Sequence, residues 1–323
     1  MADRPASGSQ EELDVTVIVI SYNSEGRIGE AVSAHESALS HLRSEILVVD
    51  NDSKDRSVIE AEAAIIHGRV IANEVNAGYG NAANQAISEA RGKTCLILND
   101  DARLATGAID RLLEVLYSQD DIALVGPRIV DEAGNAMPSA RMTFPGPHEE
   151  WERVWDIFRR RDRNVYYPAS DAPMEVAWLV AACVLGRTGV LREVGGFNPA
   201  FFLYSEDIDL ARRLIERGYR ILTVPDATCI HTGSVSTSAA FGRDRSIQRR
   251  AASRDIYYRI WQPRLSRALI HLRRAIGFSN QPWRLTHHLL KVIWDGRSLH
   301  HLREIEPLPN RSEAGEEHGA ARR

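Results

Sequence analysis

A run of polar residues, Asn99-Asp100-Asp101, directly follows the short apolar stretch 95–98. This stretch has the length of a buried strand in an open α/β sheet, where ligands bind at the carboxyl ends of the strands. Two adjacent carboxylates and an amide there are oxygen ligands of the kind that Mg²⁺ prefers, often together with substrate phosphates. The same residues could instead form a polar turn before the helix predicted at 106–117, so the stretch alone leaves both interpretations open.

Polar segments also follow two earlier predicted strands. The apolar residues 15–20 lead into Ser21-Tyr22-Asn23-Ser24, and residues 45–49 lead into a turn that begins Asp50-Asn51. A helical pattern separates each strand from the next, which predicts parallel strands joined by right-handed crossovers. The polar segments are therefore expected to meet at one edge of the sheet.

A third short strand, predicted at 69–72, leads into a segment with Asn76, Gly78 and Gly80, followed by an alanine-rich helix. Glycine permits a close backbone approach, and the amino end of a helix suits an anionic ligand. The spacing differs from that of the Rossmann GxGxxG motif, and the sequence contains no P-loop.

The acidic pair Glu206-Asp207 begins a predicted helix, with Ser205 as its expected N-cap. Carboxylates in a first helical turn are also stabilised by the helix dipole, so the pair has a structural explanation besides a chemical one. Further on, His231 stands at the end of two strands predicted at 220–224 and 227–230. A single histidine is more often structural than a ligand, and only its neighbours can change that expectation.

The chain resembles the inverting family 2 glycosyltransferases of the GT-A fold, in particular their bacterial rhamnosyltransferase-like branch. The residues that carry the resemblance are, in order, VIVISYNS, LVVDNDSKD, NAGYGNAANQAI, LILNDDA, VGGFNPAFFLYSEDIDL and IHTGS. They cover about residues 14–240, and their order and spacing matter because each motif alone is weak. The resemblance implies an α/β nucleotide-diphospho-sugar transferase fold, with a Rossmann-like, mostly parallel sheet flanked by helices.

The resemblance also implies a role for each matching residue. Asp207 would be the general base, with Glu206 as the other member of the catalytic pair, while Asp101 and His231 would hold a divalent metal, Mg²⁺ or Mn²⁺. Trp178 would lie on the acceptor side, although an ordinary core position explains a tryptophan equally well. The implied nucleotide-sugar-binding residues are Ser21, Tyr22, Asn23, Asp50, Asn51, Asn76, Gly78, Asn84, Asn99 and Asp100.

The sequence departs from the family pattern in its metal motif. Asn99 replaces the first Asp of the usual Asp-x-Asp, and Asp100 stands where this branch usually has proline. These departures leave open which carboxylate contacts the metal, and Asp101 is the preferred candidate.

The function implied is single-displacement transfer of a sugar from a UDP- or dTDP-sugar, dTDP-rhamnose among them, to a glycan or lipid-linked acceptor. Such a displacement needs a base for the acceptor hydroxyl and a cation for the departing diphosphate. Two alternatives stay open: a non-catalytic nucleotide-sugar-binding protein of the same fold, and a nucleotidyltransferase. The second should carry a basic glycine-rich signature after the first strand, which SYNSEGRIG is not.

The 323 residues, 44% hydrophobic and 26% charged, are typical of a globular protein with one large α/β domain and an appendage. Residues 1–13 are predicted to be a disordered arm, 14–240 the GT-A catalytic domain, 241–305 a basic amphipathic helical extension and 306–323 a disordered tail. Between residues 243 and 304 the sequence has 14 Arg or Lys against 4 Asp or Glu, a balance of +10.

The helical pattern in the basic extension runs over about 255–301 and is interrupted at Pro263 and Pro282. Its cationic face could lie on an anionic membrane, or pack on the acidic catalytic domain, or form a homo-oligomer. No nucleic-acid motif accompanies it, so nucleic acid is not an expected partner.

The three cysteines, Cys95, Cys183 and Cys229, lie in or beside apolar runs and lack the spacing of a metal site, which favours buried free thiols. The amino-terminal residues have no apolar core of a signal peptide, and the sequence has no apolar run of spanning length. We therefore expect a cytoplasmic protein, with peripheral contact to the inner face of the plasma membrane as an option.

Overall fold

The computed structural model describes residues 13–146, 171–232, 243–264, 266–268 and 270. The chain divides into two compact units, one made of residues 1–145 and 155–261 and the other of residues 146–154 and 262–323. The first unit holds all of the predicted site residues and is the one described below. The predicted arm up to residue 12 and the tail at 306–323 lie outside the described residues.

The amino-terminal half of the unit forms a parallel sheet with strand order β3-β2-β1-β4. Its strands are β1 (Leu13–Ser21), β2 (Ser44–Asp50), β3 (Gly68–Ala72) and β4 (Gly92–Asn99). Ser21 pairs in register with Asp50, and Ile20 with Asn99. The carboxyl ends of these strands therefore meet at one edge, as the alternation of strand and helix patterns predicts.

The second half of the sheet contains two strands of opposite direction, β11 (Cys183–Arg187) and the edge strand β5 (Ala102–Leu104). β11 runs antiparallel between β4 and β6 (Ile122–Val130), which is followed by β12 (Arg220–His231) and then by β5. The prediction of two strands at 220–224 and 227–230 is wrong. They form one strand, whose register shifts between Val224 and Thr228 around Pro225, a residue with no N–H for the ladder.

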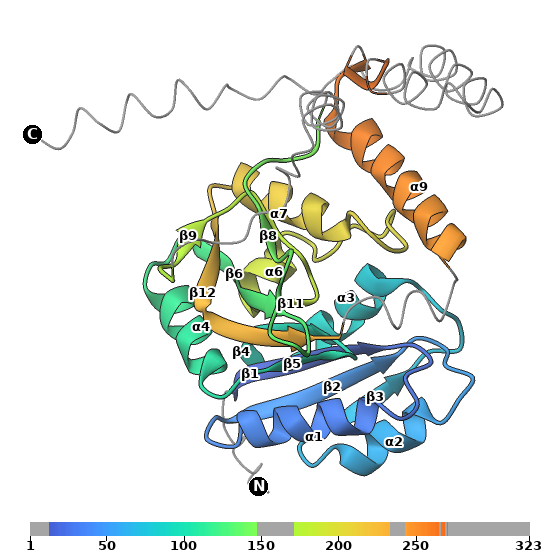
Figure 1. Cartoon of the computed structure of the whole chain (residues 1–323), viewed down its shortest axis with the longest axis vertical. Helices are drawn as coiled ribbons and strands as arrows, with labels where there is room; N and C mark the ends of the chain where they lie inside the picture. Colours follow the sequence, from blue (N-terminus) through green and yellow to red (C-terminus); the bar gives the residue numbers. More distant parts are fainter. Residues whose placement is uncertain (1–12, 147–170, 233–242, 265, 269, 271–323) are drawn as a thin grey trace, which may run out of the picture. The chain divides into compact units, whose positions relative to one another are not determined.

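Helices cover both faces of the sheet (Figure 1). On one face, alternate β1 side chains such as Val17 and Val19 pack in a core cluster with helices α1 (Ile28–Ala38) and α4 (Ala108–Tyr117), beside α2 (Ser57–Ala64). The other face is covered by α3 (Tyr79–Glu89), α6 (Thr188–Glu193) and α7 (Glu206–Glu216). Burial on both faces explains why these strands are continuously apolar.

Four two-residue strands lie in the segment before β11: β7 (Ala136–Met137), β8 (Ala140–Arg141), β9 (Met174–Glu175) and β10 (Trp178–Leu179). β10 pairs with β8 in a small separate sheet, and β9 pairs with β12. Residues 147–170 of this segment lie outside the described part of the chain.

The basic extension begins with helix α9 (Arg243–Trp261), which belongs to the first unit. The helix starts earlier than the pattern at 255 predicted and ends two residues before Pro263. Its predicted continuation to 301, with the interruption at Pro282, lies outside the described residues. Among the described helices, none combines the length and the apolar character needed to cross a membrane.

Candidate functional site

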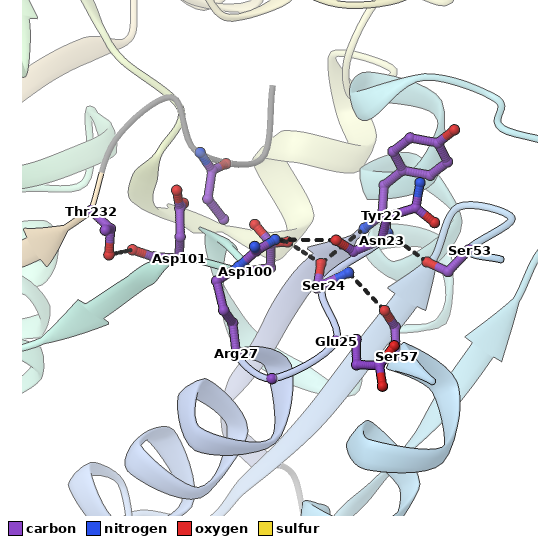
Figure 2. Close-up of polar contacts among 12 residues, drawn as sticks. Tyr22, Asn23, Ser24, Glu25, Arg27, Ser53, Ser57, Asp100, Asp101 and Thr232 are labelled. Carbon is purple, nitrogen blue, oxygen red and sulfur yellow. Dashed lines mark hydrogen bonds and ion pairs between the residues drawn. The ribbon is translucent and has the colours of Figure 1, made fainter. Parts of the chain in front are cut away.

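Two of the polar strand ends are joined by hydrogen bonds between their loops (Figure 2). The Asn23 N–H donates to Ser53 Oγ at 2.8 Å, and Asn23 Oδ1 accepts the Lys54 N–H at 2.9 Å. Asp50 accepts both the backbone N–H (2.9 Å) and the hydroxyl (2.5 Å) of the same Ser53. Ser21, which pairs with Asp50 in the sheet, is buried, and its hydroxyl has no hydrogen-bond partner among the described residues.

The third polar segment is held to the second by Asn51. Its Nδ2 donates to the Gly78 carbonyl at 3.2 Å, and its Oδ1 accepts the Ala77 N–H at 3.1 Å. Asn76 Oδ1 in turn accepts the Gly78 N–H at 3.0 Å. Five of the predicted nucleotide-side residues therefore lie in one hydrogen-bonded rim along the ends of β1, β2 and β3: Asn23, Asp50, Asn51, Asn76 and Gly78.

The two carboxylates of Asn99-Asp100-Asp101 have different neighbours. Asp100 accepts a hydrogen bond from the Ser24 hydroxyl and lies 3.5 Å from an Arg27 guanidinium nitrogen, which also donates to the Asn23 carbonyl at 3.3 Å. Figure 2 shows Asp100 turned toward Ser24 and Arg27, whereas Asp101 lies on the side of Thr232. Asp100 is thus bound to the first loop, and its predicted role in nucleotide-sugar binding stays a prediction.

Asp101 lies beside the histidine that ends β12. Asp101 Oδ1 is 3.0 Å from His231 Nε2, and the same ring nitrogen is 3.3 Å from Asn99 Nδ2. The backbone of Asp101 is fixed by its carbonyl, which accepts the Thr232 N–H at 3.1 Å. The structure therefore brings together residues that the sequence separates by more than a hundred positions.

The side chains of this group include donors that suit a divalent metal. A carboxylate, an imidazole and a side-chain amide fit a divalent cation such as Mn²⁺, which accepts oxygen and nitrogen ligands. Within the described residues, no group of three or more His, Cys, Asp and Glu side chains forms a potential metal site. Asp101 and His231 would thus supply only part of a coordination shell, and substrate oxygens and water would have to supply the rest.

The acidic pair lies at the start of α7, after two residues in left-handed backbone conformation. Tyr204 has φ 71° and Ser205 has φ 67°, a conformation that costs energy for residues other than glycine. The expectation that the Ser205 side chain caps α7 is wrong, because this hydroxyl makes no capping hydrogen bond. An N-cap normally has extended dihedral angles, which Ser205 lacks.

Both carboxyl groups of the pair are shifted toward the protonated form. Burial, together with the negative charge of Asp207, raises the pKa of Glu206 well above its ordinary value. Glu206 Oε2 is buried without a hydrogen-bond partner among the described residues. Burial also raises the pKa of Asp207 to about 6, against the opposing hydrogen bonds from the Ile208 and Ala181 backbone. A carboxylate with a pKa near neutrality is suited to general base catalysis.

A two-residue segment links the acidic pair to the polar end of β4. The Ala182 carbonyl accepts the Asn99 N–H at 3.1 Å, and the Ala181 N–H donates to the Asp207 carboxylate. The Ala181 carbonyl accepts the Tyr79 hydroxyl at 2.6 Å. Asp207 is therefore connected to the strand end that carries Asp101 through two consecutive residues.

Two residues assigned by resemblance are engaged in packing. Asn84 donates to the Phe197 carbonyl and accepts the Phe197 N–H, both at 2.7 Å, so its amide holds the turn before α7. The indole N–H of Trp178 donates to the Thr143 carbonyl at 3.1 Å, and the residue is 9% exposed. These contacts favour the core alternative for Trp178. The nucleotide-pocket role of Asn84 and the acceptor-side role of Trp178 stay predictions.

Sequence reasoning missed Tyr79, Arg27 and the site role of Ser24. Tyr79 stands in the glycine segment, but its partner Ala181 is 102 positions away, which no local pattern reveals. Arg27 directly precedes α1. Its positive charge next to the first strand-end loop is the sequence signal that could have indicated it. Ser24 lay within the polar segment without a distinguishing neighbour.

Two glycosyltransferases of one organism are among the relatives of this chain. It is 32% identical over 219 residues to the N-acetylglucosaminyl-diphospho-decaprenol L-rhamnosyltransferase of Mycobacterium tuberculosis, an alignment that covers 62% of this chain and 68% of that protein. It is 27% identical over 238 residues to the pre-mycofactocin glycosyltransferase of the same organism, covering 71% of this chain and 44% of the relative.

Solved structures share the fold. The mannosyltransferase PcManGT from Pyrobaculum calidifontis, in complex with GDP-Man and Mn²⁺, matches 97% of this chain and 81% of its own with a TM-score of 0.50 at 17% identity. GalNAc-T7 with UDP, GalNAc and Mn²⁺ matches 69% of this chain and 44% of its own with a TM-score of 0.51 at 17% identity. Both are GT-A glycosyltransferases, and the mostly parallel, helix-flanked sheet described above is this fold.

The family comparison covers the strand ends that form the site. The sequence model described as glycosyl transferase family 2 matches residues 16–179, which contain β1 to β4 and the Asn99-Asp100-Asp101 motif. The match spans half of the chain and agrees with the 32% identical relative. The chain belongs to glycosyl transferase family 2 and is a glycosyltransferase.

Proposed function

We propose that this glycosyltransferase is an inverting enzyme that uses Asp207 as its general base. The proposal rests above all on the environment of Asp207. Asp207 is half-buried, burial raises its pKa to about 6, and the Ala181 N–H donates to its carboxylate. In the reaction, an acceptor hydroxyl oxygen forms a bond to the anomeric carbon while the bond to the diphosphate breaks, and Asp207 takes the hydroxyl proton.

Glu206 supports this role as a neutral neighbour. Burial and the charge of Asp207 raise the pKa of Glu206 well above its ordinary value, which favours a single negative charge on the pair. We assign that charge to Asp207. Two ionised carboxylates side by side would repel each other and raise the proton affinity of both. A protonated Glu206 would spare Asp207 this repulsion, and burial is then the main cause of its raised pKa.

Asp101 and His231, with Asn99 beside them, are the residues that would hold a divalent cation. When bound, such a cation neutralises charge that develops on the departing diphosphate. The chain's own contribution is to fix these side chains through the Thr232 N–H and the Asn99 backbone. The Mn²⁺ in the structures of GalNAc-T7 and PcManGT supports this assignment.

The donor is proposed to be a nucleoside diphosphate sugar bound along the rim formed by Asp50, Asn51 and Asn23. The 32% identical relative is a rhamnosyltransferase that acts on a sugar linked by diphosphate to decaprenol, which points to a deoxyhexose donor and a lipid-diphosphate-linked acceptor. We take dTDP-rhamnose as the first donor to test and UDP-sugars as the next.

The test is nucleotide release from a panel of UDP- and dTDP-sugars, with Mg²⁺ or Mn²⁺ and an N-acetylglucosaminyl lipid diphosphate. One donor is expected to support release, and EDTA is expected to abolish it. Asp207→Asn should lower kcat about 10³-fold with donor KM unchanged, because only proton transfer is removed. The exposed Asp120→Asn serves as the matched control and should keep full activity.

The outcomes separate the proposal from its alternatives. Unchanged kcat in Asp207→Asn contradicts the base assignment. Donor binding without release by the wild-type chain, for every donor and metal, identifies a non-catalytic binding protein instead. Formation of the nucleotide-sugar from a sugar phosphate would identify a nucleotidyltransferase.

A further inference from the structure

Helix α9 is fastened along the loop and helix that carry the acidic pair. Ser253 Oγ donates to the Leu203 carbonyl at 2.6 Å, and the Trp261 indole N–H donates to Asp209 Oδ1 at 2.8 Å. Between them, Tyr257 is fully buried and its hydroxyl accepts a hydrogen bond from Arg212 of α7 at 3.2 Å. Figure 1 shows α9 and α7 on the same side of the sheet. The start of the basic extension is therefore part of the catalytic unit.

The face of α9 directed at this loop is cationic. The Arg250 guanidinium lies 4.6 Å from the Tyr204 ring centroid, and Arg249 lies 4.5 Å from that of Phe202. Arg254 follows Arg250 by four positions, so both occupy the same helix face, next to the Ser253 anchor. The positive charge of Arg254 acts on Asp207 and partly offsets the rise in its pKa that burial causes.

The guanidinium groups of these two arginines are not used in salt bridges within the described residues. Within the described part of the chain, neither Arg250 nor Arg254 forms a salt bridge with a carboxylate, and Arg250 remains exposed. An aromatic ring below a guanidinium orients its plane and leaves the N–H groups at its edge available. Guanidinium groups bind phosphate oxygens through paired, charge-assisted hydrogen bonds.

We infer that Arg250 and Arg254 of α9 form a diphosphate-binding subsite for the acceptor, next to the base. The inference rests on the proposed function, because a base must lie against the acceptor hydroxyl, so cations beside Asp207 face the acceptor. The donor diphosphate is assigned to Asp101 and His231 instead. An acceptor whose reacting sugar is linked directly to a diphosphate would place that diphosphate within one sugar of the base.

The first experiment compares two acceptors that differ in the diphosphate. N-acetylglucosamine is supplied as its farnesyl diphosphate conjugate or as the uncharged octyl glycoside, and KM is measured for each with the wild-type chain and Arg254→Gln. Losing one charge-assisted contact should raise KM for the diphosphate acceptor by about ten-fold or more. The KM values for the octyl glycoside and the donor should change less than about two-fold.

The control is Arg259→Gln, which removes the same charge from an exposed position on the same helix. It should leave all three KM values unchanged. Arg250→Gln is the second test variant and should reproduce the selective effect if Arg254→Gln does not fold. An equal rise of KM for both acceptors in these variants, or no rise for either, overturns the inference.

A binding measurement keeps this test independent of turnover. Farnesyl diphosphate is titrated calorimetrically into the full chain saturated with nucleoside diphosphate and Mn²⁺, and Arg254→Gln should weaken binding by about ten-fold. If no donor is turned over, the proposed function fails while this titration still decides the subsite. Flotation with phosphatidylglycerol vesicles tests the membrane as the other anion source. Weaker flotation of Arg254→Gln with unchanged farnesyl diphosphate affinity would overturn the inference.

Discussion

The nucleotide-side rim and the base loop, the residues 202–207 that lead into and contain the acidic pair, are built in opposite ways. In the rim, the polar groups of Asp50 and Asn51 are paired within the chain, each through two or more hydrogen bonds. In the base loop, Glu206 keeps a buried oxygen without a partner among the described residues, and Ser205 has a left-handed backbone. The rim is arranged for stable recognition, whereas the base loop holds carboxyl groups in an unfavourable environment.

The contrast shows that the unfavourable free energy lies in the base loop, beside the proposed general base. Satisfied hydrogen bonds preorganise a binding site, while an underpaired, buried carboxyl is destabilising unless it takes up a proton. The two regions meet where the Tyr79 N–H donates to the Phe202 carbonyl at 2.9 Å, directly after Gly78. Through this junction the rim supports the base loop. Substitutions in the rim and in the base loop therefore test the contrast between them.

The largest effect is expected at the junction. A Cβ atom on Gly78, which has φ 87°, would lie 2.3 Å from the Phe202 carbonyl oxygen. Gly78→Ala should therefore lower the free energy of unfolding by about 3 kcal/mol, combining steric overlap with backbone strain. Urea denaturation measures it. Gly107→Ala is the control, because Gly107 has φ 75° but nothing within 4 Å, and should cost about 1 kcal/mol. If both variants lose the same unfolding free energy, Gly78 makes no close contact with Phe202 and the proposed junction is contradicted.

The next effect is a gain in stability from removing the base. Asp207 has a folded pKa of about 6 against an ordinary value of 3.8, so ionisation opposes folding. The cost is absent below the unfolded pKa, grows as the pH rises toward 6 and is complete above it. With a discount for its partial exposure, Asp207→Asn should gain about 1–2 kcal/mol at pH 7.5 and nothing near pH 4. If Asp207→Asn is less stable than the wild-type chain at pH 7.5, the claim that the ionised Asp207 carboxylate destabilises the fold is contradicted.

The smallest effect is expected from Asp100, the carboxylate bound to the first loop. Asp100→Asn removes the ionic contact with Arg27, at 3.5 Å, but can keep the hydrogen bond to Ser24. We expect a loss of about 1 kcal/mol in unfolding free energy and a few-fold rise in donor KM with kcat unchanged. Asp110→Asn, at an exposed position, is the control. A loss of metal dependence in Asp100→Asn would instead make Asp100 a metal ligand.

The parts of the fold that local patterns encode were predictable from the sequence. Apolar runs that end in Asp50 and in Asn99 mark strand ends, and the helices between them require parallel pairing, which the structure contains. The direction of β11 was not predictable, because a buried apolar run has the same composition in a parallel or an antiparallel strand. The continuation of β12 through Pro225 was not predictable either, because proline usually ends a strand.

The sequence indicates which residues belong to the candidate site, but not which of them contact one another. The sequence indicates Asp101, Asp207 and His231 by their motifs, and the structure adds that Asp101 touches His231. The bond from Tyr79 to Ala181 depends on tertiary packing between distant segments. The pattern in α9 predicts an amphipathic helix but not the surface it covers, which proves to be the base loop.

The most direct test of the account is the pH dependence of kcat/KM for the donor that supports release. With Asp207 as base, kcat/KM should fall about ten-fold per pH unit below its pKa of about 6 and level off above it. The inflection should persist in His231→Gln and vanish from the residual activity of Asp207→Asn. A flat profile between about pH 5 and pH 7.5, or an inflection that survives in Asp207→Asn, would contradict the assignment of Asp207 as the general base.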